Sequence, residues 1–521
     1  MLANDIGTSK NAIARDTTGS TQAGAHADAA RTTAAGGVSR RAFLRAGAGA
    51  ALGLAVPAWL SGCAVRPDRA SPPWAELAAS LQGSLLLPNA PDFDKVAAPW
   101  ALQYASRLPQ AIAMCASEAD VRTSVLWSQA HAVPLVARSG GHSYAGYSTT
   151  PGLMINVSQM HAVDIDPATG IARLGGGARN RNVYAACRPF GRAVTHGRCK
   201  EVGVAGLVLG GGIGFNMRAH GLTCDGLKET RIVLADGRAL TCNAQENSDL
   251  FWACRGAGGG NFGINTGFVF ETFEVGDYAV FEIAWSDRLP QVFDALQTMA
   301  LSAPDALGMK LSVVARADMP GLTLSILGQL AGTEAELRAL LAPVYALQAP
   351  SASRIATMAY WDAQEFLSEE GYPEYSHERS RFVPSSLSPA AIQTVFDELR
   401  AWPGTHVAAT WKFFLMGGAI DRLSPAQTAF VHRGNAMISS IELEWNQQDS
   451  PERVEINQRW LSKFHDRMEP YTSAYCYQNF IDPAQQDYLH AYYGGNLQRL
   501  REVKRRYDPG NVFRYPQSIP V

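Results

Sequence analysis

Charged residues are scarce in this sequence, and they are balanced in sign. Asp, Glu, Lys and Arg make up 18% of the 521 residues, and the formal net charge is −2. A chain without a basic excess lacks the electrostatic footprint that nucleic-acid binding requires, so we expect no nucleic-acid partner. Hydrophobic residues reach 47%, which is typical of a globular protein with a sizeable core. The length predicts roughly two to four domains.

Metal-ligand and disulfide patterns are also missing. The chain has eight cysteines, and no two of them form a CxxC pair of the kind that zinc sites use. One of the eight, Cys63, lies in a separate N-terminal segment. The odd number that remains indicates no disulfide framework: Cys115, Cys187, Cys199, Cys224, Cys242, Cys254 and Cys476. We therefore predict no metal site.

A long hydrophobic run is absent as well. The stretch from Ala46 to Leu60 is short and glycine-rich, which disfavours a membrane-spanning helix. It follows Arg40-Arg41 and Phe43-Leu44, and this order resembles a twin-arginine export signal. The "LSGC" that ends at Cys63 resembles a lipobox, in which this cysteine would carry the lipid. We expect export to the periplasm or cell envelope, with a transmembrane anchor and a cleaved signal without lipid as the alternatives.

Glycine, by contrast, is abundant. The 48 glycines cluster in "LGGGARN", "LGGGIGF" and "RGAGGGNFG". Glycine permits positive φ and a close approach of the backbone to a ligand, and the bare N–H groups of such turns can hold phosphate. None of the clusters has the strand–GxGxxG–helix order of a Rossmann site. Several such loops in one part of the chain indicate a single long phosphorylated cofactor.

The pattern of apolar residues divides the chain after residue 63 into three parts. Residues 64–276 alternate helices and strands; one helix is predicted behind Ser117 from apolar spacing, and "VPLVARSGGH" is typical of a buried strand that ends in a glycine turn. Residues 277–484 contain strands such as "MKLSVVARA" and "MISSIELEW", which predict an antiparallel sheet with helices on one face. Residues 485–521 contain a predicted helix from Asn496 to Tyr507. The fold class is α+β.

Six motifs in one order along the chain carry a resemblance to a known family. They are "RSGGHSYAGYS", "CKEVGVAG" with the glycines that follow, "DLFWACRGAGGGNFG", "YQNFIDP", "YYGGNLQRL" and "YDPGNVFRYPQSI". Together they resemble the FAD-linked oxidases of the berberine-bridge-enzyme-like family, which have the vanillyl-alcohol-oxidase-type (PCMH-type) FAD-binding fold. The resemblance implies a two-part FAD-binding domain, residues 64–276 and 485–521, and a substrate-binding domain, residues 277–484. It further implies covalent FAD, with His142 bonded to the C8 methyl and Cys199 to C6 of the flavin.

The same resemblance implies which residues surround the flavin. Beside the two tethers they are Arg138, Ser139, Gly140, Gly141, Ser143, Val202, Gly203, Gly206, Gly210, Gly211, Gly212, Asn511 and Gln517. Plainer alternatives exist, because a lone turn histidine often bonds to backbone and a small buried cysteine often only fills space. Lys200 departs from the proline that is frequent after this cysteine in the family. Val202 falls where a small side chain admits oxygen, which favours an oxidase that releases hydrogen peroxide.

The catalytic base has to differ from the one that many sugar oxidases of the family use. Their Tyr-x-Asn-Tyr pattern is Tyr477-Gln478-Asn479-Phe480 here, and Phe480 cannot accept a proton. The alternation of "MISSIELEW" places Ser440, Glu442 and Glu444 on one strand face. We predict that Glu442, assisted by Tyr477, is the base and that Tyr144 contacts the substrate. The alternative is that Glu442 is a solvated strand carboxylate.

Two other functions compete with an oxidase that takes a sugar or oligosaccharide and molecular oxygen. The first is a flavin dehydrogenase that passes electrons to a quinone or a membrane carrier, which a lipid at Cys63 would favour. The second is a non-catalytic glycan-binding lipoprotein, which the presence of both His142 and Cys199 disfavours. Aromatic and secondary alcohols stay open as substrates, because a fold does not fix a function.

Overall fold

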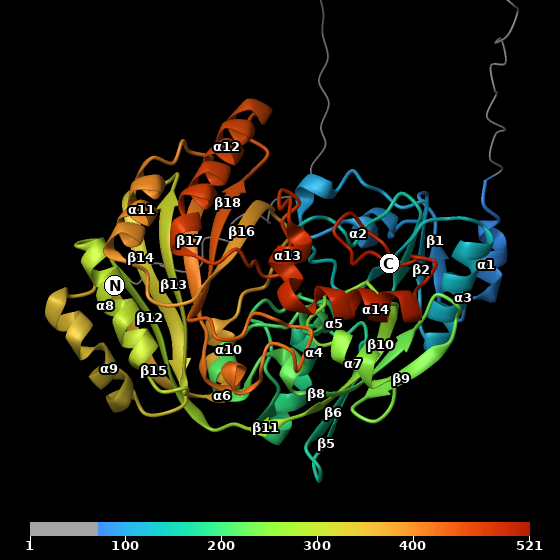
Figure 1. Ribbon diagram of the computed structural model, residues 1–521, viewed down its shortest axis with the longest axis horizontal. Helices are drawn as coiled ribbons and strands as arrows, with labels where there is room; N and C mark the ends of the chain where they lie inside the picture. Colours follow the sequence, from blue (N-terminus) through green and yellow to red (C-terminus); the bar gives the residue numbers. More distant parts are fainter. Residues whose placement is uncertain (1–70) are drawn as a thin grey trace, which may run out of the picture. The chain divides into compact units, whose positions relative to one another are not determined.

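Four β-sheets organise residues 71–521, the part of the chain that the computed structural model describes (Figure 1). Pro72–Val521 form one compact unit. The predicted export signal and the lipid-accepting Cys63 lie outside the described residues. Across residues 71–521 no helix combines the length and apolarity that a membrane span needs.

The first sheet has four strands and lies beside helix α3 (Glu118–Ala130), which contacts β4. Its strands, in sheet order, are β1 (Ser84–Leu86), β2 (Ala111–Met114), β4 (Leu153–Asn156) and β3 (Leu135–Arg138). Helix α1 (Trp74–Ser80) precedes β1, and helix α2 (Phe93–Ala97) lies between β1 and β2. As the sequence predicts, Ser117 caps α3, because its side chain accepts a hydrogen bond from Asp120 N.

The second sheet has five antiparallel strands. In sheet order the strands are β5 (Val163–Asp166), β6 (Ile171–Gly175), β10 (Ile264–Glu271), β8 (Leu227–Val233) and β9 (Ala239–Asn243). Four helices interrupt this part of the chain: α4 (Asn180–Cys187), α5 (Val204–Leu209), α6 (Met217–His220) and α7 (Ser248–Ala253). A separate two-stranded antiparallel sheet consists of β7 (Arg192–Ala193) and β11 (Phe273–Glu274).

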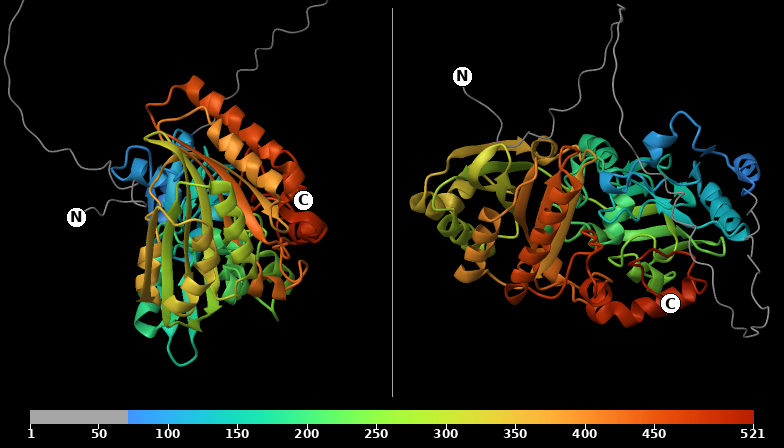
Figure 2. Two further views of the ribbon diagram at one scale, coloured as in Figure 1. Left: turned by 90° about the vertical axis from the view of Figure 1, so that its left-hand side faces the viewer. Right: turned by 90° about the horizontal axis from the view of Figure 1, so that it is seen from above.

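The largest sheet has seven strands, all antiparallel to their neighbours. In sheet order they are β15 (Ala352–Ala359), β12 (Asp277–Trp285), β14 (Met319–Leu330), β13 (Leu307–Arg316), β17 (Ala408–Leu415), β18 (Met437–Trp445) and β16 (Tyr375–Val383). Four helices pack on one face: α8 (Leu289–Ser302), α9 (Glu334–Leu347), α11 (Pro389–Arg400) and α12 (Pro451–Arg467) (Figure 2). A shorter helix, α10 (Tyr360–Leu367), contributes instead to the core that includes residues of the five-stranded sheet.

Strand alternation gives the seven-stranded sheet two unlike faces. Leu311, Trp411, Phe413 and Leu443 belong to the apolar core under the four helices. The residues between them in sequence point to the other face. That face packs against residues 172–270 and the C-terminal residues 476–519. The predicted antiparallel sheet with helices on one face is thereby confirmed.

A buried chain of hydrogen bonds joins this sheet to the preceding part of the molecule. The Tyr360 hydroxyl bonds to His196 Nε2 at 2.7 Å and accepts from Asn216 Nδ2. Gln329 Nε2 donates to Asn216 Oδ1, and Gln364 Nε2 donates to Gln329 Oε1 at 2.7 Å. Because each group lies away from water, these bonds are costly to break.

After the sheet the chain returns to the first part through α13 (Tyr488–Tyr493) and α14 (Leu497–Tyr507), and α14 contacts α7. Lys504, which is 0% exposed, donates to Asp508 Oδ2 at 2.8 Å, Asn261 O at 2.7 Å and Phe513 O at 2.6 Å. The predicted helix 496–507 is confirmed with a start one residue later. The predicted domain boundaries stay a prediction, because Pro72–Val521 are a single compact unit.

Candidate functional site

Two glycine-containing loops meet backbone to backbone at the start of the site. A Cβ on Gly140 would lie 2.3 Å from Gly203 N, and a Cβ on Gly203 would lie 2.4 Å from Gly140 N. Only a residue without a side chain allows this approach. The contact brings the loop after β3 next to the loop that precedes α5, although the two are about sixty positions apart in the sequence.

The contact places His142 and Cys199 in one small space. A Cβ added to Gly371 would lie 3.3 Å from His142 Cε1 and 3.3 Å from Cys199 Cβ. The ring of Trp100 stacks on that of His142 at 5.4 Å between centroids. Burial, with the charge of Arg179 as the next largest contribution, lowers the pKa of His142 to about 3. The imidazole is therefore neutral near pH 7 and keeps a nitrogen lone pair.

The thiol of Cys199 is held by a carboxylate. Cys199 Sγ donates to Glu369 Oε1 at 2.7 Å, and Arg198 NH2 lies 2.9 Å from Glu369 Oε2. Glu369 belongs to the segment between α10 and β16, so this residue links the predicted substrate-binding part to the predicted tether.

Several predicted cofactor residues use their side chains within the loops. Arg138 donates to the carbonyls of Ala97 and Ala98, Ser139 Oγ donates to Gly176 O at 2.9 Å, and Ser143 Oγ accepts from Tyr147 N at 3.0 Å. These three side chains thus hold the loops in shape. Gly141, at φ +77°, supplies a turn that a side chain would block against Arg138.

The run Gly210, Gly211 and Gly212 is packed as tightly. A Cβ would lie 2.1 Å from Asn479 Oδ1 at Gly210 and 2.3 Å from Thr223 Oγ1 at Gly212. Gly206 differs, because it is exposed and a Cβ there would meet no atom within 4 Å. Close packing therefore explains why the run requires glycine, but it gives no such reason for Gly206.

Two side chains of the C-terminal part carry atoms that suit a bound ligand. Gln517 Oε1 and Asn511 Oδ1 are buried, and neither accepts a hydrogen bond from the described residues. Buried polar atoms are normally satisfied, so each points to a donor that the chain does not supply. Together with the neutral imidazole, the thiol and the close-packed glycine loops, they fit the FAD that the motifs imply.

A buried charge cluster lies on the face of the seven-stranded sheet that is turned toward these loops. Lys412 Nζ on β17 lies 3.0 Å from Glu442 Oε2 on β18 and 3.1 Å from Glu378 Oε1 on β16. Burial raises the pKa of Glu378, although Lys412 opposes this. Burial alone would lower the pKa of Lys412, but the two carboxylates raise it. The ammonium is thus permanently charged and is shared by two carboxyl groups.

Tyr144 connects the charge cluster to the tether region. Its ring stacks on Trp100 at 5.1 Å and on Phe480 at 5.5 Å, and Lys412 Nζ lies 6.0 Å from the centroid of Phe480. Burial raises the pKa of Tyr144 well above its usual value, and the charges of Glu378, Cys199 and Glu442 add to this. Tyr144 and Glu442 thus lie within electrostatic range of each other, and Tyr144 stays a neutral phenol.

Tyr477 lies against the glycine run, and its ring centroid is 5.0 Å from that of Phe480. Its hydroxyl accepts hydrogen bonds from Gly212 N at 3.0 Å and Asn479 Nδ2 at 3.1 Å, and burial raises the pKa of the phenol. The assistance of Tyr477 to Glu442 stays a prediction. Lys412 on β17 is a direct partner of Glu442.

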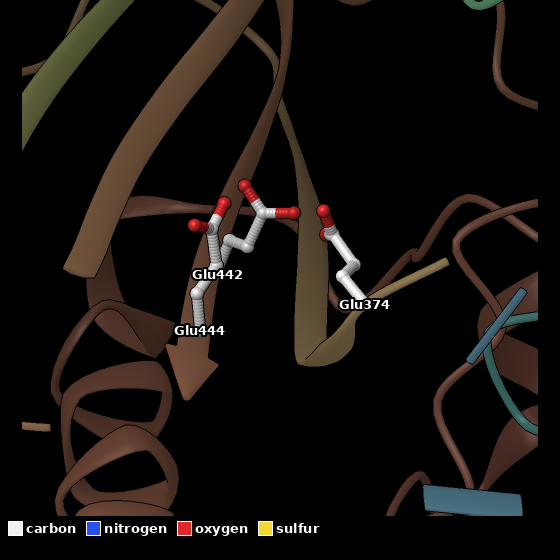
Figure 3. A group of neighbouring side chains, drawn as sticks. All are labelled: Glu374, Glu442 and Glu444. Carbon is white, nitrogen blue, oxygen red and sulfur yellow. The ribbon is translucent and has the colours of Figure 1, made fainter. Parts of the chain in front are cut away.

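Two further glutamates accompany Glu442. The side chains of Glu442 and Glu444 on β18 and of Glu374, which precedes β16, have carboxylate oxygens within 4.8 Å of one another (Figure 3). Oxygen ligands of this type suit hard cations, but like-charged groups also gather at sites that bind none. The sequence predicts no metal, and the three carboxylates belong to the polar side of the site.

Sequence reasoning missed Lys412, Glu378, Glu369 and Lys310. Burial, with the charges of Arg198 and Lys412, lowers the pKa of Lys310 to about 7. Alternation along each strand could have placed Lys310 and Lys412 on one face of their strands. Strand order and register, which bring these faces together, have no signal in a single sequence.

Comparison with known proteins agrees with this geometry. The chain matches a family model described as "FAD binding domain" over residues 109–243 and one described as "Berberine and berberine like" over residues 476–520. An uncharacterised FAD-linked oxidoreductase of Bacillus subtilis, YgaK, is 32% identical over 448 residues, which cover 84% of this chain and 97% of that protein.

Solved structures share the fold over nearly the whole described chain. Physcomitrella patens BBE-like 1 has a TM-score of 0.78 at 26% identity and covers 86% of this chain and 98% of its own. Glucooligosaccharide oxidase from Acremonium strictum, described with a 6-S-cysteinyl, 8α-N1-histidyl FAD, has a TM-score of 0.75 at 28% identity and covers 85% and 98%.

Proposed function

Because the chain belongs to the berberine-bridge-like FAD-linked oxidoreductases, we propose that it is an oxidase of a sugar or oligosaccharide hydroxyl. The observation that carries the proposal is the position of Glu442. Its carboxylate oxygen Oε2 lies 3.0 Å from Lys412 Nζ. The charges of Glu442 and Cys199 both raise the pKa of Tyr144. A proton acceptor and the predicted tether thus both lie within electrostatic range of one aromatic residue.

FAD held by His142 and Cys199 would supply an acceptor for a hydride from the substrate carbon. The described FAD of the Acremonium strictum oxidase, with one histidyl and one cysteinyl bond, supports two tethers here. The neutral imidazole and the thiol are the two nucleophiles that such attachment requires. Asn511 and Gln517 would satisfy their buried oxygen atoms on the same group.

The protein's own task in the reaction is to move one proton. In the proposal Glu442 takes the proton of the substrate hydroxyl as the carbon–hydrogen bond is broken. Lys412 holds the carboxylate in place and offsets its charge, while Glu378 occupies the other side of the ammonium. A charge pair with fixed geometry in a water-poor site costs little reorganisation during the reaction.

Aromatic rings would bind and orient the sugar. Trp100, Tyr144 and Phe480 form one stacked series beside the charge cluster, and such faces bury the apolar side of a sugar ring. The name of the Acremonium strictum relative supports a carbohydrate as substrate. Tyr144 adds a hydroxyl that can donate to a sugar oxygen.

Molecular oxygen is the proposed electron acceptor, with hydrogen peroxide as its product. The backbone O of Val202 accepts a hydrogen bond from Asn180 N at 3.0 Å. In the proposal the small side chain of Val202 would leave oxygen access to the flavin. The twin-arginine pattern at Arg40-Arg41 supports export in the folded state to the periplasm or cell envelope, with a lipid at Cys63 as the only membrane contact.

The test is anaerobic mixing of the purified protein with a panel of oligosaccharides and, in parallel, phenolic alcohols. We expect an oligosaccharide to bleach the flavin absorbance and air to restore it within seconds, with one hydrogen peroxide per turnover. Bleaching by phenolic alcohols alone would overturn the carbohydrate substrate. Reoxidation by air over minutes would favour a dehydrogenase that uses another acceptor.

A further inference from the structure

Glu369 is a carboxylate that the proposed oxidation does not use. Its backbone forms a parallel bridge with that of Cys199: Lys200 N donates to Glu369 O at 2.9 Å, and Glu369 N donates to Arg198 O at 3.1 Å. The bond of Cys199 Sγ to Glu369 Oε1, at 2.7 Å, lies across this bridge. The main chain therefore fixes the carboxylate on the thiol.

Arg198 orients the carboxylate. Its NH2 lies 2.9 Å from Glu369 Oε2, and its Nε donates to Leu367 O at 3.2 Å. With Oε2 occupied, Oε1 is directed at the sulfur. A nucleophile, a base in hydrogen-bond reach of it and a third group that orients the base form the recurring arrangement of an activated nucleophile.

We propose that Glu369 is the general base that removes the thiol proton of Cys199 when the sulfur bonds to the FAD. The inference rests on the two-point attachment in the proposed function. The thiolate is the reactive form of cysteine. Formation of the bond releases one hydrogen from the thiol and one from the ring carbon, and O2 takes up these two hydrogens with two electrons as hydrogen peroxide.

The groups around the pair favour this step. Arg198 lies within electrostatic range of Glu369 and brings positive charge to the developing thiolate. His142 also senses the charge of Glu369 and stays neutral because of its burial. Tyr144 and Tyr184 sense the charge of Cys199, and burial raises the pKa of both phenols. Glu369 is the one of these groups that directly accepts the thiol hydrogen.

The experiment follows attachment in the full chain, produced under riboflavin limitation and then mixed with FAD in air. Samples are denatured at intervals with iodoacetamide, and mass spectrometry compares alkylated with flavin-bearing Cys199 peptide. For the unchanged chain we expect a rate nearly independent of pH between about 6 and 8, because a carboxyl group of usual pKa ~4.3 is ionised throughout. Glu369→Gln should be slower by about 10²-fold or more at pH 7.

The pH dependence separates loss of a base from loss of a contact. In Glu369→Gln the rate should rise about tenfold per pH unit toward the thiol's own ionisation near ~8.5. Glu369→Asp should be slow but keep a flat profile, since it retains a carboxylate. The matched control is Glu370→Gln, whose carboxylate pairs with Lys200 at 2.9 Å instead, and it should attach flavin at the unchanged rate.

The peptide that contains His142 reports binding in every sample. A Glu369→Gln chain with flavin on His142, and with the unchanged rate and flat profile at Cys199, would overturn the inference. A rate in Glu369→Asp that rises about tenfold per pH unit would overturn it as well, even if Glu369→Gln failed to fold. Absence of flavin from Cys199 in the unchanged chain would instead overturn the two-point attachment itself.

Discussion

The two faces of the seven-stranded sheet are built from the same strands and have opposite character. On β17, Trp411 and Phe413 point into the apolar core under the helices, whereas Lys412 between them holds two carboxylates. On β18, Ile441 and Leu443 flank Glu442 in the same way. The helix-covered face resembles any protein interior, while the other face buries charge at a cost that packing on the first face must offset.

Alternate residues of one strand can therefore serve different purposes: those on one face stabilise the fold, and those on the other take part in the chemistry. Successive side chains of a strand point to opposite sides of the sheet. A substitution on one face should therefore change the free energy of unfolding, and a substitution of its neighbour should change the rate of reaction. Single substitutions on β17 and β18, and one at a residue that contacts the edge strand β16, test this separation.

The largest effect is expected on the charged face. Glu442→Gln removes the proposed proton acceptor and keeps the size of the side chain, so the rate of flavin reduction by substrate should fall by about 10²- to 10⁴-fold. Anaerobic stopped-flow absorbance measures this rate. The thermal midpoint should stay close to that of the unchanged protein, and an unchanged rate would show that another group accepts the proton.

The counterpart on the apolar face is Phe413→Ala. Phe413 is 0% exposed and packs with Phe293 and Trp411, so its loss should lower the free energy of unfolding by about 3–5 kcal/mol. Urea unfolding measures the change. The activity per folded molecule should remain within about twofold, and a collapse of activity in fully folded protein would mean that the two faces are coupled.

The smallest effect is expected at the edge strand. Burial alone would raise the pKa of Asp482, but the contacts with His377 at 2.9 Å and Arg379 at 2.8 Å lower it to about 2. Since this lies below the value for the unfolded chain, the stabilisation is complete above about pH 4 and is lost as the pH falls toward 2. Asp482→Asn should therefore cost roughly 2–3 kcal/mol at pH 7.

Urea midpoints at pH 7 and pH 3 check this dependence. The gap between Asp482→Asn and the unchanged protein should narrow at the lower pH, because the unchanged protein then loses the same interaction. A gap of equal size at both values would show that shape, and not charge, explains the effect of the substitution.

The sequence predicts the faces of single strands, and it does not predict their neighbours. The alternation around Ile441 and Glu442 places the carboxylate on the correct face, and the glycine clusters with Cys199 and His142 indicate the loops that meet. The pairing of Lys412 with Glu378 and Glu442 depends on the order β17–β18–β16. That order is set by the packing of the whole sheet, which no local pattern records.

The contacts of Tyr477 also could not be predicted from the local sequence. It occurs three residues before Phe480 in a motif that suggested chemistry, but its hydroxyl is bound by Gly212 and Asn479. Glu369 carries no motif at all, and only the bridge to Cys199 makes it visible. Contacts between segments that are distant in sequence decide which residue of a motif reaches the site.

The return of the chain through Lys504, Asn511 and Gln517 has a consequence for biosynthesis. Translation proceeds from the N-terminus, so the ribosome produces His142 and Cys199 some three hundred residues before the segment that buries Lys504 against Asn261. Until that segment emerges, the cofactor-binding site of the nascent chain is incomplete. Cofactor loading is then a late, post-translational event, and in an exported protein it would have to be finished in the cytoplasm before translocation begins.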